Sequence, residues 1–272
     1  NGHKRYVGLA LTDEVLDAHV LEYERALAPR ERKFDRMQRD LFARQRRDVL
    51  RLLREAKAFT RQVGDALFES ERWVNTFIEA GQALVQETVR AGAEAQALRF
   101  GLGVSFDIAR PAVQKWLDDR VRFWATRVNG ETGRLLTQEL DEALRLGESI
   151  PQIQGRVEKV FAFSDMVRSE RIARTETVNA TNYGSVEAYR QSEVVEGKMW
   201  LSQVDERTRE THLGAHRQVV PLDADFFVGG EHIPHPGAGS PGNGINCRCY
   251  PSDILVSGAQ VEKAFSRWYE GD

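Results

Sequence analysis

The chain has 272 residues, of which 41% are hydrophobic and 29% charged, with a formal net charge of −3. This balance supplies a hydrophobic core and excludes general disorder, and no apolar run approaches the roughly 20 residues of a membrane-spanning helix, so we expect no membrane segment. Two cysteines are too few for a disulfide-rich scaffold.

Helical periodicity dominates the first half of the sequence. Apolar residues recur at the i, i+3 and i+4 spacing, and turn signals divide them into separate helices. We expect breaks at Pro29, Gly101–Val104, Asn129–Gly130 and Gly147, and a helix cap at Ser149. The pattern predicts a helical region over residues 1–150 and a small domain over residues 151–272. The predicted fold class is α+β, mostly α, with a short antiparallel sheet and a long Pro/Gly loop in the second domain.

A basic helix is predicted from Arg30 to Arg61. It carries twelve Lys/Arg against five Asp/Glu, a net charge of +7. One interpretation is that Arg44, Arg46 and Arg47 contact DNA phosphates or an acidic partner. The interpretation we favour is a solvated face with i,i+4 ion pairs, such as a pair between Arg44 and Asp48.

The next helix carries the run Arg174-Thr175-Glu176-Thr177. Threonines are poor helix formers, so we expect side-chain hydrogen bonds to fix this turn. Glu176 is a candidate general base beside an Arg174 anion clamp. The alternative that we favour is an arginine–carboxylate pair that locks the helix to the β region.

Period-2 alternation then replaces the helical pattern. A strand is predicted at Val194–Leu201 and includes Trp200. Asp205 is expected to cap a short helical turn from Glu206 to His212, which includes Arg207 and Thr208. Short strands at Val219–Leu222 and Phe226–Val228 precede an irregular Pro/Gly-rich loop over Gly229–Gly244.

The loop ends on Asn246-Cys247-Arg248-Cys249. In a strand, residues i and i+2 point to the same face, so both sulfurs would face one site. With two of His212, His216, His232 and His235 they would form a Cys₂His₂ zinc site. The alternative is a pair of buried thiols under the loop, with His212 hydrogen-bonded to a backbone carbonyl. We therefore expect either no cofactor or a zinc ion bound by Cys247, Cys249 and His212.

Five pieces of this half, in this order and spacing, resemble one known family, the phage head morphogenesis proteins or Mu F-type minor capsid proteins. The pieces are Ile172-Ala173-Arg174-Thr175-Glu176-Thr177, Gly184 with Glu187-Ala188-Tyr189, Gly197-Lys198-x-Trp200, Asp205-x-Arg207-Thr208-Arg209-x-x-His212 and Asn246-Cys247-Arg248-Cys249. The resemblance covers about residues 150–255.

The resemblance implies a structural virion component near the portal vertex that acts in head assembly or genome delivery. Its expected partners are phage portal or capsid proteins, with packaged DNA as a further candidate, and its expected location is the virion after assembly in the host cytoplasm. It implies no catalytic residues. The rival hypothesis is an enzyme, a metal-assisted nuclease or other hydrolase that uses the His/Cys group and Glu176. A DNA-binding module is a third alternative.

Overall fold

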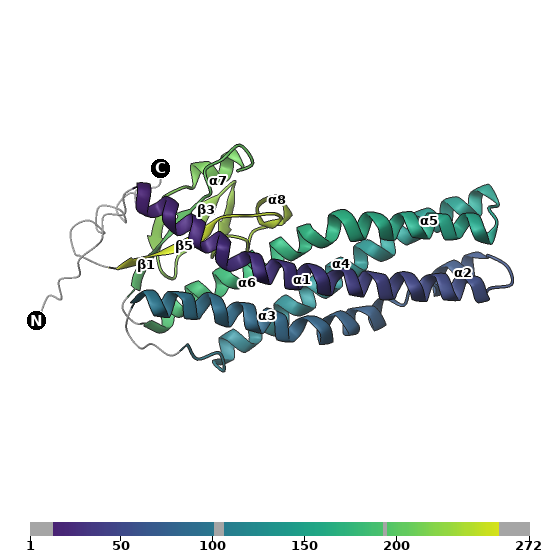
Figure 1. Cartoon of the computed structure of the whole chain (residues 1–272), viewed down its shortest axis with the longest axis horizontal. Coiled ribbons are helices and arrows are strands. Elements are labelled where there is room, and N and C mark those ends of the chain that lie inside the picture. Colours follow the sequence, from purple (N-terminus) through teal and green to yellow (C-terminus); the bar gives the residue numbers. More distant parts are fainter. Residues whose placement is uncertain (1–12, 101–105, 193–194, 256–272) are drawn as a thin grey trace, which may run out of the picture. The chain divides into compact units, whose positions relative to one another are not determined.

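A computed structural model describes residues 13–100, 106–192 and 195–255 (Figure 1). Most of these residues are helical, and two short antiparallel sheets follow in the C-terminal part of the sequence. This confirms the predicted fold class. In the part of the chain that the structure describes, no helix is long and apolar enough to cross a membrane.

Long helices make up the first two thirds of the chain. In order, the helices of this part are α1 (Asp13–Glu55), α2 (Arg61–Ala66), α3 (Ser70–Phe100), α4 (Pro111–Leu146), α5 (Ile150–Phe163), the π-helix η1 (Ser164–Arg168) and α6 (Ser169–Ser192). The predicted stop at Gly147 and cap at Ser149 are confirmed, because Gly147 has φ +65° and Ser149 forms a capping box with Gln152. The predicted break at Gly101–Val104 lies outside the described residues.

Two predicted breaks are wrong. Helix α1 continues through Pro29. Proline costs a helix about 3 kcal/mol, but Leu27 and Phe34 on either side of it are buried, and each buried side chain offsets about 1.5–3 kcal/mol. Helix α4 continues through Asn129, whose amide accepts a hydrogen bond from Gln45 (2.6 Å) and donates one to the Ala125 carbonyl (2.8 Å). Tertiary hydrogen bonds therefore outweigh the Asn-Gly turn signal.

The chain divides into two compact units. One contains residues 1–31, 86–113 and 174–272, and the other contains residues 32–85 and 114–173. This grouping follows contacts and does not test the predicted boundary at residue 150, which stays a prediction. All of the strands described belong to the first unit.

The first unit holds two sheets (Figure 1). Strand β1 (Val195–Leu201) lies between β2 (Val219–Pro221) and β5 (Tyr250–Leu255), antiparallel to both. Strands β3 (Phe226–Val228) and β4 (Glu231–Ile233) form a separate hairpin. The short helices here are α7 (Glu210–Gly214) and α8 (Pro241–Gly244).

The predicted irregular loop over Gly229–Gly244 is therefore partly wrong. Its first two glycines form the turn between β3 and β4, with φ +57° and +82°. A two-residue turn with positive φ at both positions matches the twist of a hairpin, which explains the glycine pair.

Helices α3 and α6 approach closely in this unit. A Cβ atom added to Gly184 would lie 2.1 Å from the Val89 carbonyl oxygen, and one added to Gly92 would lie 2.3 Å from the Thr181 carbonyl oxygen. Only glycine fits at such contacts between backbones. The two glycines thus position α6, which carries the Arg174–Thr177 run.

Candidate functional site

Three buried side chains with soft donor atoms meet in the first unit. His212 comes from α7, while Cys247 and Cys249 precede β5. The Nδ1 atom of His212 lies 3.3 Å from the Cys249 Sγ and 4.0 Å from the Cys247 Sγ. All three ligand atoms lie within 4.8 Å of one another. The cysteines lie just before the strand rather than in it, yet both sulfurs face one site as the spacing predicted.

Hydrogen bonds position this Cys–His group. The Ser202 hydroxyl donates to the His212 carbonyl (2.7 Å) and accepts from the indole N–H of Trp200 (3.0 Å). The Trp200 ring also packs edge-on against the imidazole, with ring centroids 5.5 Å apart. Trp200 therefore contacts both the Ser202 hydroxyl and the His212 ring.

The two thiols have opposite pKa shifts. The hydrogen bond from Cys247, followed by those with His212 and Ser202, lowers the pKa of Cys249 well below its ordinary value. The same shared hydrogen bond, together with burial, raises the pKa of Cys247. Because the two thiols share one hydrogen bond, they titrate as a coupled pair.

An ion pair holds the two sequence motifs around this group together. Arg248 Nη1 lies 2.7 Å from Asp205 Oδ2, and its Nη2 bonds the other carboxylate oxygen. Asp205 also accepts from the Arg207 N–H (3.0 Å) and the Thr208 hydroxyl (3.1 Å). Asp205 thus caps the turn at residues 205–208, and α7 begins later, at Glu210, rather than at Glu206 as predicted.

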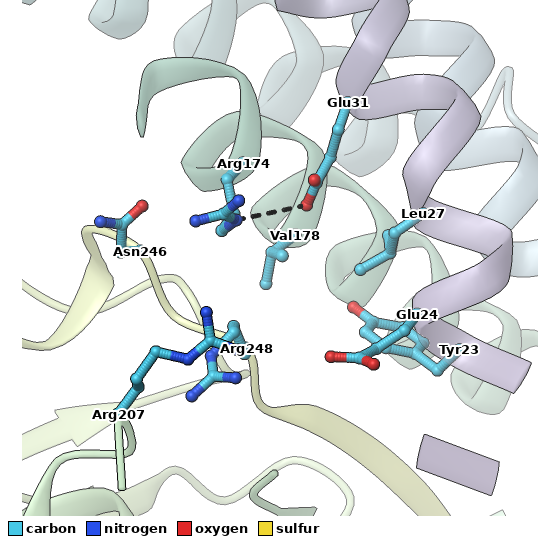
Figure 2. Close-up of a pocket in the computed structure, with 9 residues that line it drawn as sticks. All are labelled: Tyr23, Glu24, Leu27, Glu31, Arg174, Val178, Arg207, Asn246 and Arg248. Atoms are coloured by element: carbon cyan, nitrogen blue, oxygen red, sulfur yellow. Dashed lines mark ion pairs between the residues drawn. The ribbon is translucent and has the colours of Figure 1, made fainter. Parts of the chain in front are cut away.

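A pocket of about 340 Å³ adjoins this ion pair. One side carries Arg174, Arg207, Asn246 and Arg248; the opposite side belongs to α1 and carries Tyr23, Glu24, Leu27 and Glu31 (Figure 2). Val178 of α6 also lines it, and both Val178 and Leu27 belong to the same hydrophobic cluster as the two cysteines. The pocket therefore has a wall with arginines, a wall with carboxylates and an apolar part.

Comparison with known families gives one match. Residues 135–251, less than half of the chain, match the family model described as phage Mu protein F like protein. We therefore assign residues 135–251 to the phage Mu F-like family. A search of curated proteins and a search of solved structures each gave no match.

The Mu F-like region contains every motif residue that the sequence singled out between Arg174 and Cys249. The predicted resemblance to phage head morphogenesis proteins is thereby confirmed. The match supports a role related to the phage head for this region.

The Arg174–Thr177 run of the Mu F-like region lies inside the continuous helix α6. The carboxylate 3.9 Å from Arg174 is that of Glu31, while Glu176 is buried. The Thr175 hydroxyl accepts from the backbone N–H of Asn246 (3.1 Å), as expected of side-chain hydrogen bonds in this run. Asn246 has φ +57°, a conformation that asparagine tolerates better than most residues.

Sequence reasoning missed the residues that hold the Pro/Gly loop. Asn182 of α6 donates to the carbonyls of Pro236 and Cys249, both at 2.9 Å, and its Oδ1 accepts from Tyr23 (2.5 Å). Asn179, one helical turn earlier, donates to the Gly237 carbonyl (2.5 Å). The structure shows both amides buried, and buried amides need partners, but the sequence alone does not show that burial.

Of the four histidines considered for a Cys₂His₂ set, one lies with the two cysteines in the part of the chain that the structure describes. His212 is the histidine that joins the cysteines. His235 packs on Tyr183, His232 on Phe227, and the His216 Nδ1 accepts from the Ser202 N–H (3.1 Å). The imidazole of His212 faces sulfur rather than a backbone carbonyl.

Arg44, Arg46 and Arg47 of the basic segment belong to the second unit. Arg44 pairs with Asp40 (2.6 Å) rather than with Asp48 as predicted, and Arg46 lies 3.4 Å from Glu158. Arg47 is exposed. The expected i,i+4 pairing therefore occurs on α1, both between Asp40 and Arg44 and between Arg51 and Glu55 (3.1 Å).

Proposed function

We propose that this protein is a minor capsid protein near the portal vertex, and that it acts in head assembly or genome delivery. We further propose that it docks on a portal or capsid protein through the pocket of Figure 2. The observation that carries this proposal is that separate family motifs meet in one pocket. Three motifs separated in sequence each supply a pocket residue: Arg174, Arg207, and Asn246 with Arg248.

The charges of the pocket favour a protein surface over DNA. Glu24 and Glu31 lie opposite the arginines, so a phosphate backbone entering the pocket would meet carboxylates as well. A protein segment that carries both acidic and basic side chains complements both walls. Its acidic side chain would face Arg207, whose side chain is 74% exposed.

A charge reversal tests the docking surface. In Arg207→Glu the arginine wall loses a cation and gains a carboxylate, so we expect the copies of the protein per purified virion to fall at least about tenfold, equivalent to 1.4 kcal/mol. Lys115→Glu is the matched control, because Lys115 is 76% exposed and lies outside the pocket. Virion content is measured by quantitative mass spectrometry, and thermal unfolding checks that both variants fold.

Equal incorporation of Arg207→Glu and wild-type protein would overturn the docking surface. The position near the portal has its own test. A photo-cross-linking amino acid in place of Asn246 is expected to form an adduct with portal or capsid protein in intact virions. Adducts with tail or internal proteins alone would contradict the proposed position.

Packaged DNA is a second candidate partner, favoured by the +7 segment Arg30–Arg61. Binding through this segment predicts an affinity that falls steeply with salt and drops when Arg44, Arg46 and Arg47 are neutralised together. A fluorescence titration with duplex DNA at several salt concentrations measures both effects. Salt-independent binding, or no binding, removes DNA as a partner.

The hydrolase alternative has less support than the structural role. The Cys–His group is 1–2% exposed, and Glu176 does not belong to it. A bound metal has a structural use in the proposed role, because the group shares a hydrophobic cluster with the pocket residues Leu27 and Val178. Nuclease activity that is lost in His212→Ala would favour the enzyme instead.

A further inference from the structure

The buried Cys–His group has the composition of a metal site. Thiolate sulfur and imidazole nitrogen are the donors that zinc prefers, and three such donors from two separate segments meet here. We propose that His212 Nδ1, Cys247 Sγ and Cys249 Sγ bind one zinc ion, which fixes the turn that lines the pocket. The metal site does not depend on where in the phage head the protein is located.

The distances fit this assignment. Zinc bonds of about 2.0–2.3 Å at tetrahedral angles place a nitrogen and a sulfur ligand about 3.5 Å apart. The two N–S separations are 3.3 and 4.0 Å, on either side of that value. Small side-chain rotations therefore bring both sulfurs to bonding distance.

The second ring nitrogen of His212, Nε2, shows that hydrogen bonding does not explain why this ring is buried. Nε2 of His212 is buried and has no hydrogen-bond partner among the residues described. An imidazole kept only for its hydrogen bonds would use both nitrogens, because an unpaired buried polar group costs stability. Hydrogen bonds alone therefore do not account for the burial of this ring, and zinc on Nδ1 would leave the hydrogen on Nε2.

Burial decides between a structural and a catalytic metal. The three ligands are 1%, 1% and 2% exposed, which leaves no path for a substrate. The Ser202 hydroxyl lies 3.5 Å from the Cys249 Sγ and already bonds the Trp200 indole and the His212 carbonyl. The described residues supply three ligands, and their burial favours a metal that stabilises the fold over one that acts on a substrate.

The proposed metal ligands alternate in sequence with residues that line the pocket. Cys247 and Cys249 point to the group, whereas Asn246 and Arg248, between and before them, line the pocket. Fixing the two sulfurs therefore fixes the backbone that presents Asn246 and Arg248. Both thiols bind as thiolates, so metal binding releases protons to solvent.

The test measures metal content and stability of the full chain, produced without a histidine tag under reducing conditions. We expect one zinc per chain by elemental analysis and native mass spectrometry. His212→Ala and Cys249→Ser are expected to lower zinc content at least about tenfold. His232→Ala is the matched control, because His232 is exposed and lies outside the group, and it should keep the full zinc content.

A second measurement covers variants that fail to fold. Cadmium added to the reduced wild-type protein should give the ultraviolet absorption of cadmium–thiolate bonds at one equivalent, and a chelator should lower the unfolding temperature by at least about 5 °C. Absence of zinc, cadmium absorption and chelator effect together would overturn the site. Zinc that stays bound in both His212→Ala and Cys249→Ser would also overturn it, because the metal would then lie elsewhere.

Discussion

The ion pair of Asp205, beside the pocket, should make the stability of the fold depend on pH. The hydrogen bond from Arg248 holds the pKa of this carboxyl well below its usual range. Because an unfolded aspartate titrates near about 3.9, the ion pair stabilises the fold fully above about pH 5, and this contribution is lost as the pH falls through 4 and lower. Asp205→Asn should therefore unfold at a lower temperature than the wild type at pH 7, and the difference should shrink by about pH 3.

Thermal unfolding across this pH range measures the effect. Asp119→Asn is the control, because Asp119 pairs with Lys115 on the surface, where the side chains are 66% and 76% exposed. Its effect should be small at every pH. A constant deficit of Asp205→Asn from pH 7 to pH 3 would contradict the ion-pair explanation.

A second residue, Lys198 of β1, should make the stability of the fold depend on pH in the alkaline range. Its side chain is fully buried and donates to the Pro234 carbonyl (2.6 Å). Burial lowers the pKa of this amine to about 8, while the unfolded chain keeps a value near about 10.4. Between these values the unfolded chain binds more protons, so stability should rise with pH. Relative to Lys198→Met, the wild-type protein should become more stable from about pH 8 to 10, as measured by urea unfolding. A difference that does not change over this range would contradict the lowered pKa.

The sequence reached the site residues unevenly. The sequence alone predicted a group of Cys247, Cys249 and His212. Cysteine and histidine are typical metal ligands, and the Cys-x-Cys spacing places both sulfurs on one face. The ion pair between Arg174 and Glu31 could not be predicted. Glu31 is 143 positions away in the sequence, and no motif around Glu31 distinguishes it. Asn179 and Asn182 were missed for a similar reason, since exposed asparagines on helices are common and only burial makes them informative.

At the scale of elements, the contact between α3 and α6 gives a matched pair of substitutions. Gly184→Ala places a methyl group 2.1 Å from the Val89 carbonyl oxygen, so the helices must separate. Overpacking of this kind costs about 1–3 kcal/mol. Gly155→Ala in α5 meets no atom within 4 Å, and alanine favours a helix over glycine by about 1 kcal/mol. We expect the first variant to unfold at lower denaturant concentration than the wild type and the second at slightly higher. If both shift in the same direction, close packing is not what requires Gly184.

The elements that sequence patterns placed wrongly share a physical cause. Pro29 and Asn129 are strong local signals, but each lies in a helix with buried side chains around it, and burial outweighs local preference. Strand β4 was missed because Glu231–Ile233 lies inside the Pro/Gly-rich stretch, whose composition favours a loop. The Gly229–Gly230 pair that precedes it was the usable signal, since such a pair joins hairpin strands.

For the whole molecule, the unit that bears the site is not continuous in sequence. Its core includes Leu27 of α1 beside Val178 and Trp200, and Tyr23 stacks on Tyr250 at 4.7 Å. Its α6 helix packs on the backbone of α3 at Val89. A fragment of residues 151–272, the predicted second domain, lacks the α1 and α3 contributions and would expose the surfaces they cover.

Each large apolar side chain left uncovered costs about 1.5–3 kcal/mol, and a domain has only about 5–15 kcal/mol to lose. We therefore expect the fragment 151–272 to show no cooperative unfolding, whereas the full chain shows it. Circular dichroism during heating and amide dispersion in nuclear magnetic resonance spectra measure this. A fragment that unfolds cooperatively and keeps dispersed amide signals would show that the boundary near residue 150 separates two autonomous domains. In that case the contacts of Tyr23, Leu27 and Val89 would be additions to a fold that residues 151–272 already specify.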